Sequence, residues 1–296
     1  MTVRVFPERP RVAVAANCIL GEGPIWDPRS ATLYWVDIDG GALWSWQPDG
    51  EAEAQRRLVG ERVGFVLLTP DPDQLVLGLK TGLARLRVSG GAPEMILSPE
   101  PDLPGNRLND AGVGPDGSVY LGTMNDTERM PTGSFYYWSE RGLSRFGGHA
   151  IVTNGPTVDP VRGVLYAANT SEGHVYRHAI GPDGRPGPAE DFVTFRPGDG
   201  HPDGITVDAE SHVWICHFGG SRITRFSPEG EPVLIVPVPT AQVTKLAFGG
   251  PDLATAYVTT AARDRDRETD PMAGDLFVFE PGIRGIAAEP VRVGLR

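Results

Sequence analysis

The chain has 296 residues, of which 40% are hydrophobic and 22% are charged, a composition typical of a globular protein. Its formal net charge of −11 argues against nucleic acid or an anionic membrane as a partner, because both require a positive protein surface. No apolar run approaches the length of a membrane span and the N-terminus lacks a signal-peptide pattern, so Cys18 and Cys216 are expected to be reduced thiols in a cytoplasmic protein.

Six similar apolar segments recur along the chain, and each predicts a β-strand. They are TLYWVDI, QLVLGLK, SVYLGTM, VLYAANT, HVWICHF and TAYVTTA, which begin at residues 32, 74, 118, 164, 212 and 255. A turn rich in Asp, Pro or Gly precedes each segment, and a second apolar segment such as GALWSWQ or GSFYYW follows most of them. No stretch has a sustained helical period. Four short strands in each repeat of roughly 45 residues are typical of a propeller blade.

The repeats therefore predict an all-β fold, a six-bladed β-propeller. Repeats from about residue 15 to about residue 285 account for nearly the whole chain, so residues 1–296 are expected to form a single domain. The segments RVAVAANC (residues 11–18) and AEPVRVGL (residues 288–295) are candidate strands that close the ring.

Polar residues stand at corresponding places, nine to eleven positions before the start of five repeats: Glu22, Asn109, Asn154, Asp203 and Thr244. The second repeat has Val63 and Gly64 there instead. In a propeller the first strand of every blade lines the central channel. We therefore expect the polar side chains to face a shared pocket near the axis.

Glu22, Asn154 and Asp203 together suggest a central site for one divalent cation. Carboxylate and amide oxygens suit Ca²⁺, Mg²⁺ or Mn²⁺, while Zn²⁺ or Fe²⁺ fits if water completes the coordination. Three protein ligands leave positions open, as a catalytic metal requires. The alternative is that these residues only hydrogen-bond water in a wet channel.

Six short motifs in the same order resemble the SMP-30/gluconolactonase family, which also includes regucalcin. They are GEGPIWDP (21–28), NRLNDAGVGPDG (106–117), GTM (122–124), TNGP (153–156), PDGITVDAE (202–210) and FGGPDLATAYVTTAAR (248–263). The resemblance implies a six-bladed propeller with a divalent cation in its channel, and hydrolysis of aldonolactones, which are sugar acids closed as cyclic esters.

The resemblance also assigns residues. Glu22, Asn154 and Asp203 match the family's metal ligands, and Arg107 and Asn109 match residues that contact substrate hydroxyls. From the residues alone, Arg107 is equally consistent with a surface ion pair, and Asn109 and Asp110 with a loop-capping turn.

Two positions depart from the family pattern. Thr127, between Asp126 and Glu128, stands where some relatives have a substrate-binding Glu, so which of the three faces the substrate is open. Asn169 stands where many relatives have Asp. Both departures bear on sugar specificity.

The favoured hypothesis is a metal-dependent lactonase that converts a sugar lactone to the aldonic acid and works as a monomer or small homo-oligomer. The metal polarises the lactone carbonyl, and either Asp203, as general base, or the metal activates the water. A broader lactonase or organophosphate esterase is one alternative, and a non-enzymatic Ca²⁺-binding propeller is another. Serine hydrolase and zincin chemistry are disfavoured because G-x-S-x-G and H-E-x-x-H motifs are absent from the sequence.

Overall fold

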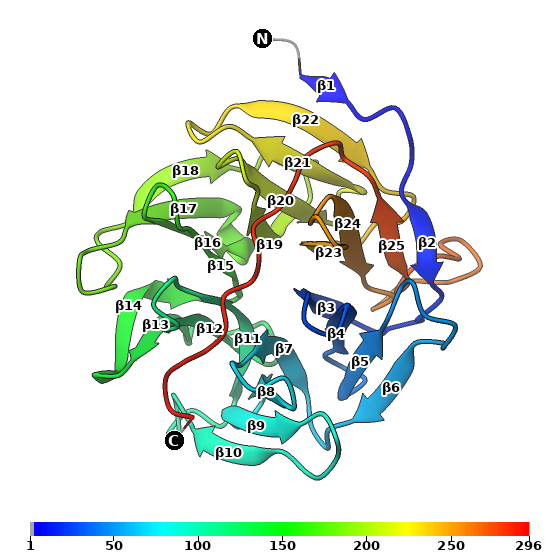
Figure 1. Ribbon diagram of the computed structural model, residues 1–296. Coiled ribbons are helices and arrows are strands. Elements are labelled where there is room, and N and C mark those ends of the chain that lie inside the picture. The colour runs from blue at the N-terminus through cyan, green and yellow to red at the C-terminus, as the bar shows by residue number, and fades with distance from the viewer. Residues whose placement is uncertain (1–2, 296) are drawn as a thin grey trace.

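Six β-sheets surround a common axis in the computed structural model, which describes residues 3–295 (Figure 1). The predicted all-β, six-bladed propeller is confirmed. One 3₁₀ turn, η1 (Thr170–Glu172), interrupts the strands. No helix that could span a membrane occurs among residues 3–295.

Each blade runs outward from the axis in chain order. The first consists of β3 (Gly21–Asp27), β4 (Thr32–Asp37), β5 (Ala42–Trp46) and β6 (Gln55–Leu58), and the second of β7 (Val63–Leu68), β8 (Gln74–Leu79), β9 (Leu83–Arg87) and β10 (Glu94–Leu97). The third consists of β11 (Asn106–Val113), β12 (Val119–Asn125), β13 (Gly133–Ser139) and β14 (Gly142–Ala150), and the fourth of β15 (Thr153–Asp159), β16 (Val164–Asn169), β17 (His174–Ala179) and β18 (Glu190–Thr194). The fifth contains β19 (His201–Val207), β20 (Val213–Phe218), β21 (Arg222–Phe226) and β22 (Pro232–Pro237), and the sixth contains β23 (Val243–Gly249), β24 (Thr255–Thr260) and β25 (Leu276–Phe279).

The six repeated segments form the second strand of each blade, as the repeat predicts. These strands are buried on both faces because neighbouring blades pack against them, and every residue of β4 is buried. Burial falls toward the outer edge, where three of the four residues of β6 are exposed. The apolar repeat thus corresponds to the second strands, through which neighbouring blades pack together.

The N-terminus closes the ring. Strand β2 (Arg11–Val14) pairs antiparallel with β25 and becomes the outer strand of the sixth blade, as expected for RVAVAANC. Strand β1 (Arg4–Val5) pairs in parallel with β22 and adds a fifth strand to the fifth blade.

The prediction of a strand at residues 288–295 is wrong. This segment has no strand structure and crosses one face of the ring, where Figure 1 shows it in red. Its backbone bonds to two different blades, because Val291 N donates to the carbonyl of Leu68 at 2.8 Å and Arg292 N to that of Gly117 at 3.0 Å. Strand β2 already occupies the place beside β25, so the alternating valines of this segment are buried against the face instead.

Candidate functional site

The innermost strands of neighbouring blades contact one another around the axis. In every blade the pairing of this strand with the second strand is interrupted near its start, at Glu22/Ile25, Val63/Phe65, Leu108/Asp110, Asn154/Thr157, Pro202/Ile205 and Val243/Lys245. Such bulges twist a strand and change where its side chains point. The six bulges lie at equivalent positions, which is why residues from separate blades meet.

Glycine follows each predicted metal ligand and permits this local geometry. Gly23 and Gly155 have φ of +55° and +61°, a left-handed conformation that glycine adopts without a steric penalty. A Cβ on Gly155 would lie 2.4 Å from Cγ1 of Ile205, so the neighbouring strand also requires its absence. The E-G and N-G pairs in the sequence are therefore part of the bulge geometry.

The five residues predicted for the site line one cavity of about 440 Å³ at one end of the channel. They are Glu22, Arg107, Asn109, Asn154 and Asp203, from the first, third, fourth and fifth blades. Each of the five is less than 10% exposed. The structure thus brings all five predicted residues together.

A chain of hydrogen bonds orients the amides in the cavity wall. Arg107 Nη1 donates to Asn109 Oδ1, and Asn109 Nδ2 donates to Asn154 Oδ1 at 2.9 Å. Asn154 Nδ2 donates to Thr170 Oγ1 at 3.0 Å, and this hydroxyl donates to the carbonyl of Pro202 at 2.8 Å. These hydrogen bonds fix the orientation of the Asn154 side-chain amide, and thus the position of its oxygen. They extend to Pro202, the residue next to Asp203.

The surroundings of Glu22 and Asp203 disfavour the charge of both carboxylates. Burial, followed by the Asp110 carboxylate, raises the pKa of Glu22 from 4.5 to about 8. Burial, followed by the Glu22 carboxylate, holds the pKa of Asp203 well above its ordinary value. Two buried carboxylates beside an oriented amide oxygen form a donor set that a hard divalent cation fits, because its charge offsets their repulsion.

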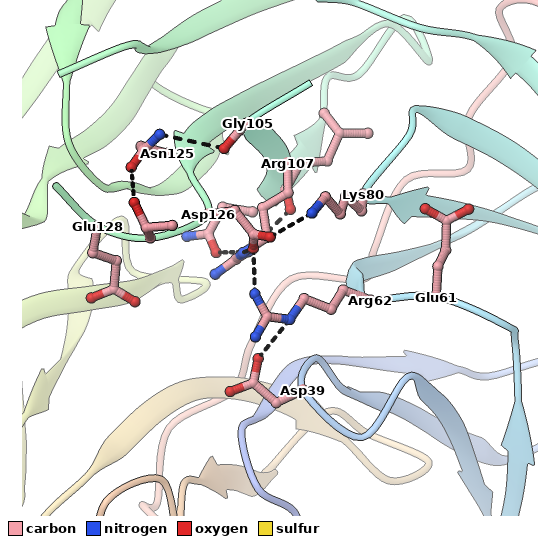
Figure 2. Close-up of polar contacts among 12 residues, drawn as sticks. Asp39, Glu61, Arg62, Lys80, Gly105, Arg107, Asn125, Asp126 and Glu128 are labelled. Carbon is pink, nitrogen blue, oxygen red and sulfur yellow. Dashed lines mark hydrogen bonds and ion pairs between the residues drawn. The ribbon is translucent and has the colours of Figure 1, made fainter. Parts of the chain in front are cut away.

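Arg107 is a buried wall residue, with only 4% of its side chain exposed. Its Nε lies 3.3 Å from Oδ1 of Asp126, and Figure 2 shows the two residues side by side. Burial lowers the pKa of Arg107 to about 10, while the Asp126 carboxylate acts in the opposite direction. The alternative of a surface ion pair is therefore wrong. The turn alternative for Asn109 and Asp110 is also wrong, since both lie within β11.

Residues 126–128 differ in the groups that their side chains contact. Asp126 accepts a hydrogen bond from Lys80 Nζ at 2.7 Å and another from Arg62 (Figure 2). Thr127 Oγ1 donates to Asn125 Oδ1 at 2.7 Å. Glu128 lines the cavity. Of these three residues, Glu128 is the one whose position allows contact with a molecule in the cavity.

Sequence reasoning missed several polar lining residues, among them Thr170 and Arg263. Thr170 follows Asn169, the last residue of β16, and Arg263 lies in the loop after β24, where its Nη1 donates to Glu128 Oε1. Neither belongs to an innermost strand, so the channel register gives no sign of them. His201 lines the cavity as well, whereas the ring of His217 is buried and its Nδ1 lies 2.7 Å from the carbonyl of Asp199.

Fold and site together define a six-bladed propeller with a polar, acidic cavity at one end of its channel. The model of the family described as "SMP-30/Gluconolactonase/LRE-like region" matches residues 20–262. This range covers most of the chain and contains all five predicted site residues. The chain belongs to this family.

Individual relatives resemble the chain over nearly its full length. An L-arabinolactonase of Azospirillum brasilense is 33% identical, covering 90% of this chain and 90% of the relative. A 6-deoxy-6-sulfogluconolactonase of Pseudomonas putida is 30% identical, covering 96% of this chain and 98% of the relative. Among solved structures, a calcium-binding protein, regucalcin, from Agrobacterium tumefaciens has a TM-score of 0.93 at 26% identity, covering 99% of this chain and 100% of that one.

Proposed function

We propose that this chain hydrolyses a sugar lactone to its aldonic acid, with a divalent cation held by Glu22, Asn154 and Asp203. Lactonase activity is supported by the family and by relatives named as lactonases at about 30% identity. The observation that carries the metal proposal is the convergence of two buried carboxylates and an oriented amide oxygen on one cavity.

The donor set fits Ca²⁺, Mg²⁺ or Mn²⁺ best, and Zn²⁺ or Fe²⁺ with additional water. When bound, such a cation supplies Lewis-acid chemistry, which polarises an ester carbonyl and stabilises the negative charge that develops on its oxygen. Asn154 suits a ligand role because Asn109 and Thr170 fix its amide. Glu22 is held similarly, since its Oε2 accepts a hydrogen bond from Gly23 N at 2.7 Å.

Asp203 is the proposed general base. Hydrolysis requires a water oxygen to bond to the lactone carbonyl carbon while a nearby group takes the proton of that water. The ring C–O bond then breaks, and the departing oxygen takes up a proton to become a hydroxyl of the open acid. Asp203 lines the cavity, where a carboxylate that a cation keeps ionised could accept a proton from a water molecule beside it.

Arg107 and Asn109 are proposed to orient the sugar. Arg107 is positively charged, planar and held by Asp126, so N–H groups that the protein leaves free can donate to sugar oxygens. Asn109 stands between Arg107 and Asn154 and would position a hydroxyl close to the proposed cation. Glu128 can accept from a further hydroxyl, which gives it the place expected for the substrate-binding Glu of some relatives.

The polar lining favours this proposal over a broader esterase, because apolar lactones and phosphotriesters prefer apolar walls. Arg107, Glu128 and Arg263 instead offer donors and acceptors that match a polyhydroxylated ring. A purely Ca²⁺-binding propeller predicts cation binding without turnover.

The test is acid release from a panel of pentonolactones and hexonolactones, measured after chelation and again after each metal is added back singly. The proposal expects turnover that chelation abolishes and at least one metal restores. Acyl-homoserine lactones and aryl phosphotriesters serve as comparison substrates. Turnover that survives complete metal removal contradicts the metal proposal, and binding of metal without turnover of any lactone favours the non-enzymatic alternative.

A further inference from the structure

The residues directly after the channel-facing layer form a second layer, one step further along the channel. Four blades have glycine in this layer, namely Gly23, Gly64, Gly155 and Gly204. The third and sixth blades have Asp110 and Lys245 instead. One acid and one base thus occupy a layer from which the other four blades contribute no side chain.

Asp110 and Lys245 join across the channel in a buried ion pair. Lys245 Nζ donates to Asp110 Oδ1, although one residue belongs to β11 and the other to β23. The Asp110 carboxylate is only 1% exposed and also accepts from Ala111 N at 2.8 Å and Gly155 N at 2.9 Å. Three donors therefore fix the position of the Asp110 carboxylate.

The glycine layer makes room for this pair. A Cβ on Gly204, the residue after Asp203, would lie 2.4 Å from Cγ of Lys245. The stem of Lys245 therefore packs directly against the backbone that carries Asp203. Gly155 N, which donates to Asp110, belongs to the residue after Asn154. Both members of the pair thus contact the backbone next to a proposed cation ligand.

The pair also lies between two cavities. The cavity of about 440 Å³ contains the proposed ligands, whereas Asp110 and Lys245 line a second cavity of about 170 Å³ further along the channel. Residues 286–289 of the C-terminal segment line this second cavity too. The ion pair is therefore the floor of the site, with the C-terminal segment beyond it.

We propose that Asp110 and Lys245 are positioning residues that set the charge beneath the cation site, with Asp110 favouring a bound divalent cation and Lys245 opposing it. This inference depends on the cation proposed above. Charges interact strongly in a buried site of low effective dielectric constant, so each member of the pair acts on the cation although neither is a ligand. The two opposite charges nearly cancel, so the intact pair adds little net charge beneath the cation site.

The same two charges already act on the carboxylates of the site. Asp110 raises the pKa of Glu22 and of Asp203, whereas Lys245 lowers the pKa of both. A purely structural ion pair has a different signature. Its loss lowers stability, but there is no reason for its two halves to change cation affinity in opposite directions.

The test compares Asp110→Asn, Lys245→Met and the double variant with the wild type, in direct titrations with Ca²⁺ and with Mn²⁺. We expect Asp110→Asn to raise Kd at least about tenfold and Lys245→Met to lower it at least about tenfold, because a charge near a divalent ion in a buried site has a large effect. The double variant should return to within about threefold of the wild-type Kd.

Arg225→Met is the matched control, because Arg225, on the third strand of the fifth blade, forms a buried ion pair with Asp208, the residue after β19. It should lower the melting temperature and leave Kd unchanged. If Asp110→Asn does not fold, Lys245→Met and the double variant decide, since tighter binding in the first and its reversal in the second are both required.

Two failures are distinguishable. If the wild type binds the cations and Lys245→Met leaves Kd unchanged or raises it, the floor inference is overturned and the proposed function stands. If the wild type binds none of the added metals, the cation proposal fails and this inference fails with it.

Discussion

Replacing Glu22 by glutamine removes a buried carboxylate without changing the size of the side chain. The pKa of Glu22 is about 8 in the folded chain because burial and the Asp110 carboxylate disfavour its charge. A carboxyl with a raised folded pKa keeps its proton in the folded state and loses it on unfolding. Its contribution to stability is therefore fully present below about pH 4.5, the unfolded value, and is lost as the pH rises toward 8.

The magnitude follows from how far pH 7 lies above the unfolded pKa of 4.5, because the folded carboxyl, with a pKa of about 8, is still mostly protonated at pH 7. One pKa unit corresponds to about 1.4 kcal/mol, so at pH 7 the wild type without metal is destabilised by on the order of 3 kcal/mol relative to acid pH. Glu22→Gln lacks this group and can still accept the hydrogen bond of Gly23 N through its amide oxygen. We expect the metal-free variant to be more stable than the wild type by up to about 3 kcal/mol at pH 7 and about equal to it at pH 4.5.

The assay is urea unfolding with excess chelator at several pH values, repeated with saturating Ca²⁺. Added cation should reverse the order, because it stabilises only a folded state that binds it. Asp37→Asn is the control: Asp37 is also buried, but its carboxylate accepts from Leu20 N, Gly40 N and Ile19 N. That variant should lose about 1–3 kcal/mol with or without metal. A metal-free Glu22→Gln that is less stable than the wild type at pH 7 refutes the reasoning.

Three further predictions concern the walls and the ends of the channel. Arg107→Met should raise KM for sugar lactones at least about tenfold and change kcat less, whereas an unchanged KM removes Arg107 from substrate binding. Gly155→Ala should cost about 1–3 kcal/mol in urea unfolding, because its φ is +61° and its Cβ would lie 2.4 Å from Cγ1 of Ile205; an unchanged midpoint contradicts the bulge argument. Deletion of residues 285–296 should cost about 3 kcal/mol by the same assay, since it removes the buried Val291 and Val293 and exposes the apolar residues that they pack against; full retention of stability would show that this segment does not stabilise the ring.

The sequence was sufficient for the architecture because the second strands are buried on both faces. Their apolar segments therefore repeat with little variation, and the preceding turns mark each reversal of the chain. The same link between burial and apolar pattern explains why the strand prediction for the C-terminal segment is wrong. Its alternating Val291 and Val293 resemble a strand, but whether a strand forms depends on a free partner edge, which β2 had taken. Sequence periodicity reports burial and does not specify the hydrogen-bonding partner.

Residues of the innermost strands could be placed together from the sequence because all six bulges lie in one register. The positions of Glu22, Asn154 and Asp203 relative to their repeats predict that they share a pocket, and the three residues line one cavity. Arg263 could not be found, because it lies in a loop outside that register. The pairing of Lys245 with Asp110 was equally hidden, because the two residues are 135 positions apart and meet only when the ring closes.

The most direct test of the account is the position of the metal itself. Anomalous diffraction from crystals grown with Mn²⁺ should place one ion in the large cavity, about 2.0–2.6 Å from oxygen atoms of Glu22, Asn154 and Asp203. A Mn²⁺ ion bound elsewhere would contradict the account. So would an ion in the large cavity from which these three side chains point away.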